Sequence, residues 1–462
     1  MVEGVVVMAN TNFKSGLILF PLLFVAACAQ KPEVEENVRL VIENDEAVLA
    51  QRVTRPNTDI PLDTPPAKGA LPGGEGIASA PTFAVGDSAT LTLVAEVASP
   101  VVDGNVLQAT EVRVRGDYAY VSYNMNGEQF IGGVEIIDVS NPDNPKLVSS
   151  AIVKDTDVHA MTIHRDDVYL AGGSSNPNLS TPAMLERFSV LGGKVSSEST
   201  LIDIPSFAAT DVDVAGGYVY VTSGAELGYV SVLNRSDLSL STMINFDNAR
   251  GVDTNKGSKV AAISGETRDG TAARLVVFDR DSGAILPGKD FSFPGAATIQ
   301  DSKSTVEIKK DIAFLGLGDG GTKIVCMNDG TVIKEFPQPI IAGLHFSKTV
   351  TNSVSAYKRA LFMSNGEAGI YMALAAKDFN KHHDDEVTRI GNGCAVDALE
   401  IVGQLQFGVS ESANHVVYRK KLLYVASGLG GLKIVKVNVS GKNSDNELHA
   451  EYYHDDDDET DN

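Results

Sequence analysis

Hydrophobic residues along this chain fall mostly in short runs that alternate with polar residues and end in turn-forming residues. The stretch GGVEIIDVSNPDNPKLVSS, residues 132–150, shows the pattern. Val134, Ile136 and Val139 lie in a run of β-favouring residues, and SNPDNP follows before apolar residues resume. Asparagine and aspartate bond their own backbone in turns, and proline has no amide to donate to a continuing strand. The pattern therefore predicts two strands joined by a tight turn.

The same strand–turn–strand pattern recurs along the chain. The segment TEVRVRGDYAYVSYN, residues 110–124, has six counterparts, and the intervals between them are 42 to 62 residues, the period of propeller blades. The second strands of the seven units are centred near Tyr120, Tyr169, Tyr220, Ala262, Phe314, Phe362 and Tyr424. Most units continue with a third strand such as YVSVLN and a fourth such as STMINF. The repeat predicts an all-β fold, a seven-bladed β-propeller with four-stranded antiparallel blades.

The seventh unit stops one strand short, after GLKIVKVNVSG at Gly441. The segment ATLTLVAEVA, residues 89–98, precedes the first complete unit and has no partner of its own. We expect this N-terminal strand to complete the last blade, because closing the ring removes an open sheet edge. The segment NELHAEYYH, residues 446–454, is the alternative closing strand. The expected propeller therefore spans residues 89–441.

One blade carries a specific resemblance. The sequence GGVEIIDVSNPDNPKLV, preceded by GDYAYVS, resembles the LVIVD repeat of bacterial and archaeal surface propellers. The last blade matches the repeat in part, in GLGGLKIVKV, and the middle blades keep the strand pattern without the DVSNP ending. The resemblance implies a propeller and a cell-surface address, with no settled activity.

The N-terminal segment carries a targeting pattern. The apolar stretch GLILFPLLFVAAC, residues 16–28, is too short to span a bilayer comfortably and ends in small residues. Val25–Cys28 resembles the lipobox of bacterial lipoproteins, which implies that residues 1–27 are a signal peptide and that the Cys28 thiol is lipidated; a plain secretory peptide is the alternative. By the rule of that family, Ala29 after the cysteine implies the outer membrane. We therefore expect a protein anchored by lipid to the bacterial cell envelope, facing the periplasm or the exterior.

Two segments of different composition flank the expected propeller. Residues 28–88 are acidic at first and then rich in proline and glycine, as in RPNTDIPLDTPPAKGALPGGEG, which is typical of a flexible tether. A short helix within residues 33–53 is the alternative for the first part. Residues 442–462 end in HDDDDETDN and predict a disordered, solubilising acidic tail.

The net charge of the chain limits the classes of partner that we expect it to bind. The 462 residues contain 38 basic and 60 acidic side chains, for a net charge of −22. A field of this sign repels phosphate backbones, so we expect no nucleic-acid partner. The expected partners are the membrane, through the lipid anchor, and a protein or a surface glycan.

Local motifs for chemistry are weak. No nucleophile elbow, HExxH or spaced zinc pattern is present, and we expect no cofactor and no metal site. The cluster HHDDE, residues 382–386, lies in an insertion of the sixth unit, and we interpret it as a solvated loop because adjacent side chains rarely point at one centre. Cys326 and Cys394 fall in neighbouring blades, and we favour buried free thiols over a disulfide.

Propellers bind ligands mainly where the innermost strands begin around the central channel. Aligning the first strands of the units selects polar side chains that we expect to converge there, although such side chains can also simply hydrate the channel. The candidates are Glu111, His159, Asp211, Arg250, Asn352, Asn414 and His415.

We favour a cell-surface or outer-membrane interaction module without catalytic activity, because the chain shows no catalytic motif. The alternative is an extracytoplasmic hydrolase or lyase whose active site lies in the channel, with acid and base drawn from His159, His415, Asp211 and Glu111.

Overall fold

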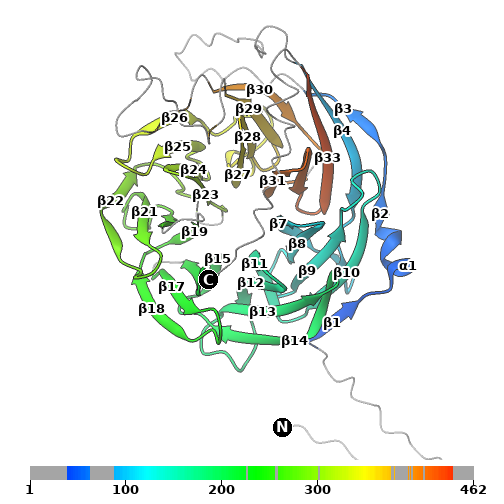
Figure 1. The fold of residues 1–462 in the computed structure, drawn as a ribbon, viewed down its shortest axis with the longest axis horizontal. Helices are drawn as coiled ribbons and strands as arrows, with labels where there is room; N and C mark the ends of the chain where they lie inside the picture. Colours follow the sequence, from blue (N-terminus) through cyan, green and yellow to red (C-terminus); the bar gives the residue numbers. More distant parts are fainter. Residues whose placement is uncertain are drawn as a thin grey trace, which may run out of the picture. The chain divides into compact units, whose positions relative to one another are not determined.

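The computed structural model describes residues 39–62, 88–224, 227–254, 259–299, 302–375, 379, 394, 396, 399–408 and 411–440. Within these ranges seven antiparallel sheets stand as blades around a central channel (Figure 1). In each blade the first strand lies nearest the channel, and the following strands lie progressively further out. The seven-bladed propeller predicted from the repeat is confirmed.

Blades 1 to 3 each contain four consecutive strands. Blade 1 is built from β7 (Gln108–Arg115), β8 (Tyr118–Asn124), β9 (Gly132–Asp138) and β10 (Lys146–Val153). Blade 2 is built from β11 (Thr156–His164), β12 (Asp167–Ser174), β13 (Ala183–Leu191) and β14 (Lys194–Asp203). Blade 3 is built from β15 (Ala208–Ala215), β16 (Tyr218–Gly224), β17 (Tyr229–Asn234) and β18 (Leu240–Asn245).

Blades 4 to 6 repeat this order. Blade 4 is built from β19 (Ala249–Thr254), β20 (Lys259–Ser264), β21 (Ala273–Asp279) and β22 (Ile285–Phe293). Blade 5 is built from β23 (Thr305–Lys309), β24 (Ile312–Gly316), β25 (Thr322–Cys326) and β26 (Val332–Phe336). The short 3-10 helix η2 (Phe346–Lys348) leads into blade 6, which is built from β27 (Ser353–Tyr357), β28 (Ala360–Ser364), β29 (Ile370–Leu374) and β30 (Glu400–Leu405).

The seventh blade takes its outer strand from the other end of the chain. It contains β31 (His415–Arg419), β32 (Leu422–Ala426), β33 (Leu432–Ser440) and β4 (Ser88–Val97). β4 pairs antiparallel with β33 over its whole length, from Leu432 opposite Val97 to Ser440 opposite Ser88. A small hairpin, β5 (Val101–Val102) with β6 (Asn105–Val106), then leads into blade 1. The ring is closed by the N-terminal strand, as the unpaired pattern of residues 89–98 predicts.

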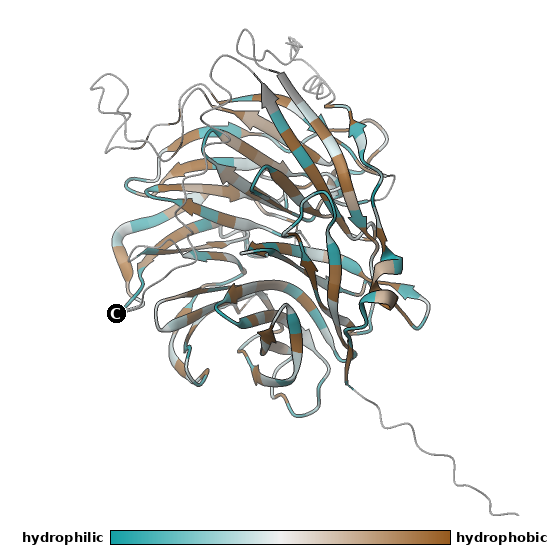
Figure 2. Ribbon diagram, turned by 45° about the vertical axis from the view of Figure 1, so that its right-hand side comes forward, coloured by the Kyte–Doolittle hydropathy of each residue, from teal (hydrophilic) through white to brown (hydrophobic). Residues whose placement is uncertain are grey.

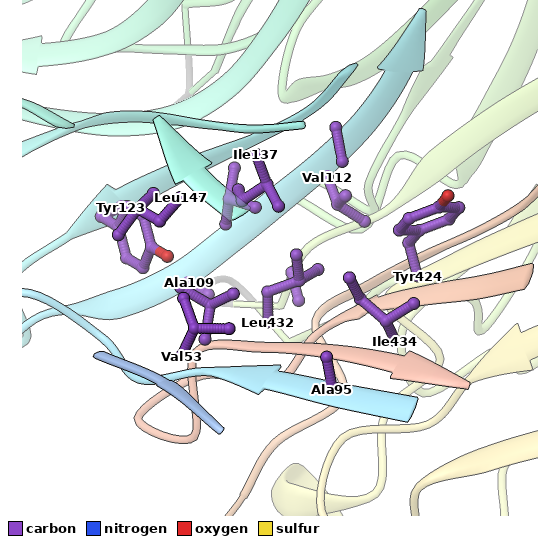
Figure 3. Close-up of a cluster of buried hydrophobic side chains, with 14 of the residues drawn as sticks. Val53, Ala95, Ala109, Val112, Tyr123, Ile137, Leu147, Tyr424, Leu432 and Ile434 are labelled. Carbon is purple, nitrogen blue, oxygen red and sulfur yellow. The ribbon is translucent and has the colours of Figure 1, made fainter. Parts of the chain in front are cut away.

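The hydrophobic core lies between neighbouring blades. The aromatic residue that recurs in the second strands is buried in six units, as Tyr120, Tyr169, Tyr220, Phe314, Phe362 and Tyr424. Between blades 7 and 1, Tyr424 belongs to a cluster with residues of β2, β4, β7, β8, β9, β10 and β33, including those labelled in Figure 3. Hydrophilic and hydrophobic positions alternate along several strands (Figure 2). The inner strands are buried on both faces, as in β8, where Val121 packs in the cluster shared with blade 7 and Tyr120 in the cluster shared with blade 2.

Residues 39–62, here called the N-terminal belt, fold onto the outer edges of blades 1 and 7. The belt contains β1 (Leu40–Glu43), helix α1 (Glu46–Leu49), the 3-10 helix η1 (Ala50–Arg52), β2 (Val53–Thr54) and β3 (Thr58–Ile60). β1 is a fifth strand of blade 1, paired with β10, and β2 and β3 both pair with β4. A flexible tether over residues 28–88 is therefore wrong for residues 39–62.

The belt is held by apolar burial and by two ion pairs. Leu49 and Val53 are buried in the core between blades 7 and 1. Arg39 makes a bidentate ion pair with Glu186, whose side chain is 0% exposed, with both nitrogen–oxygen distances at 2.7 Å. Arg52 makes a second bidentate pair, with Glu135 of β9. Within the described residues, the belt therefore supplies the cationic partners of both buried carboxylates and belongs to the folded propeller.

Cys326 in β25 and Cys394 form a disulfide, with their Cα atoms 5.6 Å apart. Our preference for buried free thiols is therefore wrong. Both cysteines belong to a hydrophobic cluster that also contains Phe379 and Leu399, so the described parts of the sixth-unit insertion pack back onto blade 5. The separation of 68 residues along the chain does not reveal this return.

Several expectations lie outside the described residues. These are the signal peptide and Cys28, the proline- and glycine-rich part of the tether, the HHDDE cluster at residues 382–386, and the acidic tail from residue 442 onward. None of the helices in the described part of the chain has the length and apolarity needed to cross a membrane.

Candidate functional site

A cavity of about 600 Å³ opens where the innermost strands begin, and we call it the mouth cavity. Its wall is contributed by all seven blades. The lining residues are Gln108, Thr110, Asn124, His159, Phe207, Ala208, Thr210, Gly224, Asn248, Arg250, Arg268, Ser302, Lys303, Ser304, Asn352 and Asn414. This volume lies within the range of small-molecule sites, although the lining is more polar than is usual for them.

Seven of these residues occupy equivalent positions, one in each blade, and we call them the mouth ring. They are Thr110, His159, Thr210, Arg250, Ser304, Asn352 and Asn414. In blades 1 to 4 the ring residue is the extra residue of a β-bulge in the innermost strand. In blades 5 to 7 it directly precedes that strand. A bulge turns one side chain away from the regular alternation, and here the bulged residue lines the cavity.

Six members of the mouth ring are fixed by a hydrogen bond to the next blade. Each donates to a main-chain carbonyl oxygen there: Thr110 Oγ1 to Val158 (2.9 Å), His159 Nδ1 to Ala209 (2.9 Å), Thr210 Oγ1 to Ala249 (3.0 Å), Arg250 Nη1 to Ser302 (2.9 Å), Asn352 Nδ2 to Ala413 (3.2 Å) and Asn414 Nδ2 to Ala109 (2.9 Å). The seventh, Ser304, is 1% exposed, and its buried Oγ has no hydrogen-bond partner among the described residues. The ring therefore presents an ordered polar wall with one unsatisfied hydroxyl.

The structure separates the seven candidates chosen from the sequence into two groups. His159, Arg250, Asn352 and Asn414 lie in the cavity wall. The other three, Glu111, Asp211 and His415, do not line the cavity and are 1%, 2% and 5% exposed. Each of these three follows a ring residue by one position, and adjacent strand residues point in opposite directions.

The alignment of the first strands missed five polar wall residues that matter to the site, one of which, Arg268, lies in a loop outside the aligned strands. Thr110 and Thr210 take the places assigned to Glu111 and Asp211, because a bulge adds one residue that strand alternation does not reveal. Lys303 and Ser304 are the contribution of blade 5, which had no candidate. Their only signal is the polar segment SKST directly before the strand TVEIK.

Buried charges form the floor beneath the wall. The Glu111 carboxylate lies 2.6 Å from Arg113 Nε, 2.9 Å from Lys303 Nζ and 3.7 Å from His415 Nε2. Burial alone would raise the pKa of Glu111, but Arg113 and Lys303 outweigh it and hold that pKa at about 2. Lys303 Nζ also approaches the carbonyl oxygens of Thr110 (3.4 Å) and His159 (3.1 Å). Lys303 therefore ties blade 5 across the channel to blades 1 and 2.

The two histidines are neutral at physiological pH. Burial lowers the pKa of His159, and it lowers the pKa of His415 to about 3. His159 Nδ1 donates to the carbonyl oxygen of Ala209, so Nε2 is the unprotonated nitrogen of that ring.

Asp211 completes the floor. Its carboxylate accepts hydrogen bonds from the backbone amides of Val212 (2.9 Å) and Val252 (3.0 Å). Burial, and then the neighbouring Glu111 carboxylate, raise the pKa of Asp211 to about 7. The charge of the floor therefore changes near neutral pH.

Further carboxylates lie deeper in the channel and link the innermost strands. Asp213, Asp253 and Glu307 accept hydrogen bonds from the backbone amides of Thr254 (2.8 Å), Ile308 (2.6 Å) and Ala356 (2.7 Å), each in the next blade. In the part of the chain that the structure describes, no three His, Cys, Asp or Glu side chains are arranged to hold a metal ion. The three hydrogen bonds to Asp213, Asp253 and Glu307 connect neighbouring blades.

The mouth cavity offers binding groups but few proton-transfer groups. His159 is the one histidine in its wall, and no Asp or Glu appears among its described lining residues. General acid–base catalysis requires a positioned donor and acceptor within reach of the substrate. Most of the described lining residues carry side chains that can form hydrogen bonds.

Comparison with known families identifies the repeat. The family model described as LVIVD repeat matches residues 108–152 and 208–245, which correspond to blades 1 and 3. The chain carries LVIVD repeats. The resemblance seen in blade 1 is thereby confirmed, and the matched third blade is one of those that keep the strand pattern without the DVSNP ending. The seven-bladed structure shows that each LVIVD repeat forms one four-stranded blade.

Solved structures of distant sequence share the architecture of this LVIVD propeller. U3-55K is 11% identical, with 73% of this chain and 98% of that chain covered and a TM-score of 0.51. Hydrazine synthase from Kuenenia stuttgartiensis is 10% identical, with 73% and 97% covered and a TM-score of 0.53. At such identities the likeness shows the fold alone. No curated protein matches the sequence significantly.

Proposed function

We propose that this LVIVD propeller is a lipid-anchored binding protein of the bacterial cell envelope, which holds its ligand in the mouth cavity. The observation that carries the proposal is the mouth ring. One polar side chain from each of seven blades reaches the same cavity, and six are fixed in place by hydrogen bonds. A wall that is ordered before binding loses little side-chain entropy when the ligand arrives.

The positions of the other ionisable groups support binding over catalysis. Glu111 is occupied by Arg113 and Lys303, and both oxygens of Asp211 accept backbone amides. Neither side chain lines the cavity, and neither does His415. A hydrolase or lyase built from His159 would find no aspartate or glutamate beside it among the described lining residues.

Binding at the mouth ring can be tested by blocking it. Asn352 is 6% exposed in the cavity wall, and a leucine there removes an amide and places an apolar group in the site. Asn234, at the end of β17, is absent from the cavity wall and provides a matched Asn→Leu control. A panel of glucose, galacturonate, glucose 6-phosphate, lysine and putrescine should yield at least one compound that raises Tm of the wild type and of Asn234→Leu but not of Asn352→Leu. Equal shifts in all three proteins would place binding elsewhere and contradict the proposal.

The cellular address rests on the lipobox pattern Val25–Cys28 and on Ala29 after the cysteine. Acyl chains contribute about 0.8 kcal/mol per buried CH₂, so two or three chains anchor the protein stably. Cells fed a palmitate analogue should label the wild type and not Cys28→Ala, and Cys28→Ala should leave the membrane fraction. An unlabelled wild type together with a membrane-bound Cys28→Ala would exclude this anchor.

A further inference from the structure

The mouth cavity differs in charge from the rest of the chain. The whole chain carries a net charge of −22. The described lining of the cavity contains the three cationic residues Arg250, Arg268 and Lys303 and no aspartate or glutamate. A wall of this composition in an acidic protein attracts a small anion into one place.

Lys303 differs from the two arginines of the wall, because it is paired with the buried Glu111 carboxylate. Beneath the wall, Lys303 and Arg113 face the carboxylates Glu111 and Asp211, so the cationic side chains that lie in the wall without a carboxylate among the described lining residues are those of Arg250 and Arg268. Arg250 comes from the innermost strand of blade 4, and Arg268 comes from the loop between β20 and β21. Arginine presents a planar fork of donors that matches a carboxylate or a phosphate.

The neutral part of the wall is rich in hydrogen-bonding groups. Asn352 and Asn414 use Nδ2 to donate to the neighbouring blade, and the buried Ser304 Oγ has no partner among the described residues. Buried hydroxyls in proteins are almost always hydrogen-bonded, so Ser304 is a place for a polar atom of a ligand. Phe207, whose side chain is 65% exposed, adds an apolar surface at the edge of the cavity.

We propose that the mouth cavity binds a small hydroxylated anion, a sugar acid or a sugar phosphate. The inference rests on the proposed binding function and adds the chemistry of the ligand. Arg250 and Arg268 bind the acidic group of the ligand. The side-chain amides of Asn352 and Asn414 and the Ser304 hydroxyl bind its hydroxyl groups, and Phe207 packs against the C–H face of the sugar ring. A cavity of about 600 Å³ suits a ligand of this size.

Isothermal titration of the purified protein tests the class of ligand. Galacturonate and glucose 6-phosphate represent the two acidic groups, and glucose is the neutral control. At least one of the two anions should bind at least 10-fold more tightly than glucose, and its affinity should fall as NaCl is raised, because salt screens the attraction. The preferred anion distinguishes a carboxylate from a phosphate ligand. Failure of both anions to bind, or equal binding of glucose, would overturn the assignment.

Matched variants locate the interaction. Arg268 is exposed in the loop between β20 and β21, so Arg268→Gln should leave the fold intact. Arg274→Gln removes the same charge from β21 of the same blade, where Arg274 pairs with Asp290 outside the cavity. Anion affinity should fall about 10- to 100-fold in Arg268→Gln or in Arg250→Gln, as expected for a lost hydrogen bond to a charged group, and should be unchanged in Arg274→Gln. Unchanged affinity in both cavity variants would refute the anion site.

The outcomes for this inference and for the proposed function can be told apart. If a neutral or cationic compound of the panel binds and Asn352→Leu blocks it, the cavity is a binding site and the anion inference fails. If no compound binds in a way that Asn352→Leu blocks, both fail.

Discussion

The ion pair between the N-terminal belt and blade 1 gives the most quantitative prediction of the fold. Arg52 of η1 contacts Glu135 of β9 through both terminal nitrogens, at 2.5 and 2.9 Å. The Glu135 side chain is 0% exposed, whereas the Arg52 side chain is 24% exposed. We consider the substitution Arg52→Met, which keeps the apolar stem and removes the guanidinium.

The expected cost follows from leaving Glu135 buried without its cation. Two charge-assisted hydrogen bonds are lost, each about 1.5–3 kcal/mol. Breaking a buried ion pair by removing one partner costs about 3–5 kcal/mol, because the remaining charge stays desolvated. Arg52 Nε also donates to the carbonyl oxygen of Ala98 at the end of β4, at 3.1 Å. Arg52→Met should therefore lower the free energy of unfolding by about 3–5 kcal/mol.

Urea unfolding of four proteins measures this energy. They are the wild type, Arg52→Met, Glu135→Gln and the double variant. The double variant should be more stable than the sum of the two single losses implies, with a coupling energy of at least ~2 kcal/mol, because the two groups contact each other directly.

A surface pair of the same type is the control. Arg274 and Asp290 also contact each other twice, at 2.9 and 2.5 Å, but the Asp290 side chain is 44% exposed. Arg274→Met should cost about 0–1 kcal/mol. If Arg52→Met costs no more than Arg274→Met, the belt is not held by buried charge and the reasoning is refuted.

Three further predictions follow from other contacts. Replacing Cys326 or Cys394 by serine should lower the free energy of unfolding by about 4 kcal/mol, because the cross-link spans 68 residues and restricts the unfolded chain. Dithiothreitol should destabilise the wild type but neither serine variant. Equal sensitivity of all three proteins to the reductant would contradict the disulfide. A chain starting at Ser88 should still melt cooperatively by circular dichroism, with a Tm lower than that of the full chain. A chain starting at Ser99 loses β4 and exposes the edge of β33, so its melt should lose cooperativity. A cooperative melt of the chain starting at Ser99 would contradict closure of the ring by β4. Burial raises the pKa of Asp211 to about 7, so its contribution to stability is fully present below about pH 4 and is lost as pH rises through 7. Asp211→Asn should therefore gain stability over the wild type in urea unfolding at pH 8 and not at pH 4, and the opposite order would show that the folded pKa is lowered.

The blades were predictable because their signal is local. Alternation of period two and turn residues repeat within each unit, and the recurring aromatic at positions such as Tyr169 and Phe314 marks the same strand in successive blades. The closing strand could be predicted for a related reason, since residues 89–98 form a strand pattern with no local partner and a ring must close.

The parts that were missed depend on contacts between distant residues. Arg39 and Arg52 lie in a segment whose composition indicates a tether, and their partners Glu186 and Glu135 are far away along the chain. The disulfide depends in the same way on how an insertion returns to blade 5.

The candidate site was displaced by a single residue in two blades. The bulges at Thr110 and Thr210 add one residue to a strand, and alternation read from the sequence then assigns the wall to Glu111 and Asp211. A shift of one residue exchanges the two faces of a strand, so the polar wall and the charged floor were confused.

A crystal structure of the propeller bound to galacturonate or to glucose 6-phosphate, whichever binds more tightly, would test the central claim most directly. The account predicts ligand density in the mouth cavity, with the acidic group at Arg250 or Arg268 and a ligand oxygen within hydrogen-bond distance of Ser304 Oγ. Density on the outer strands or on the opposite end of the channel, with the mouth cavity holding only water, would contradict it.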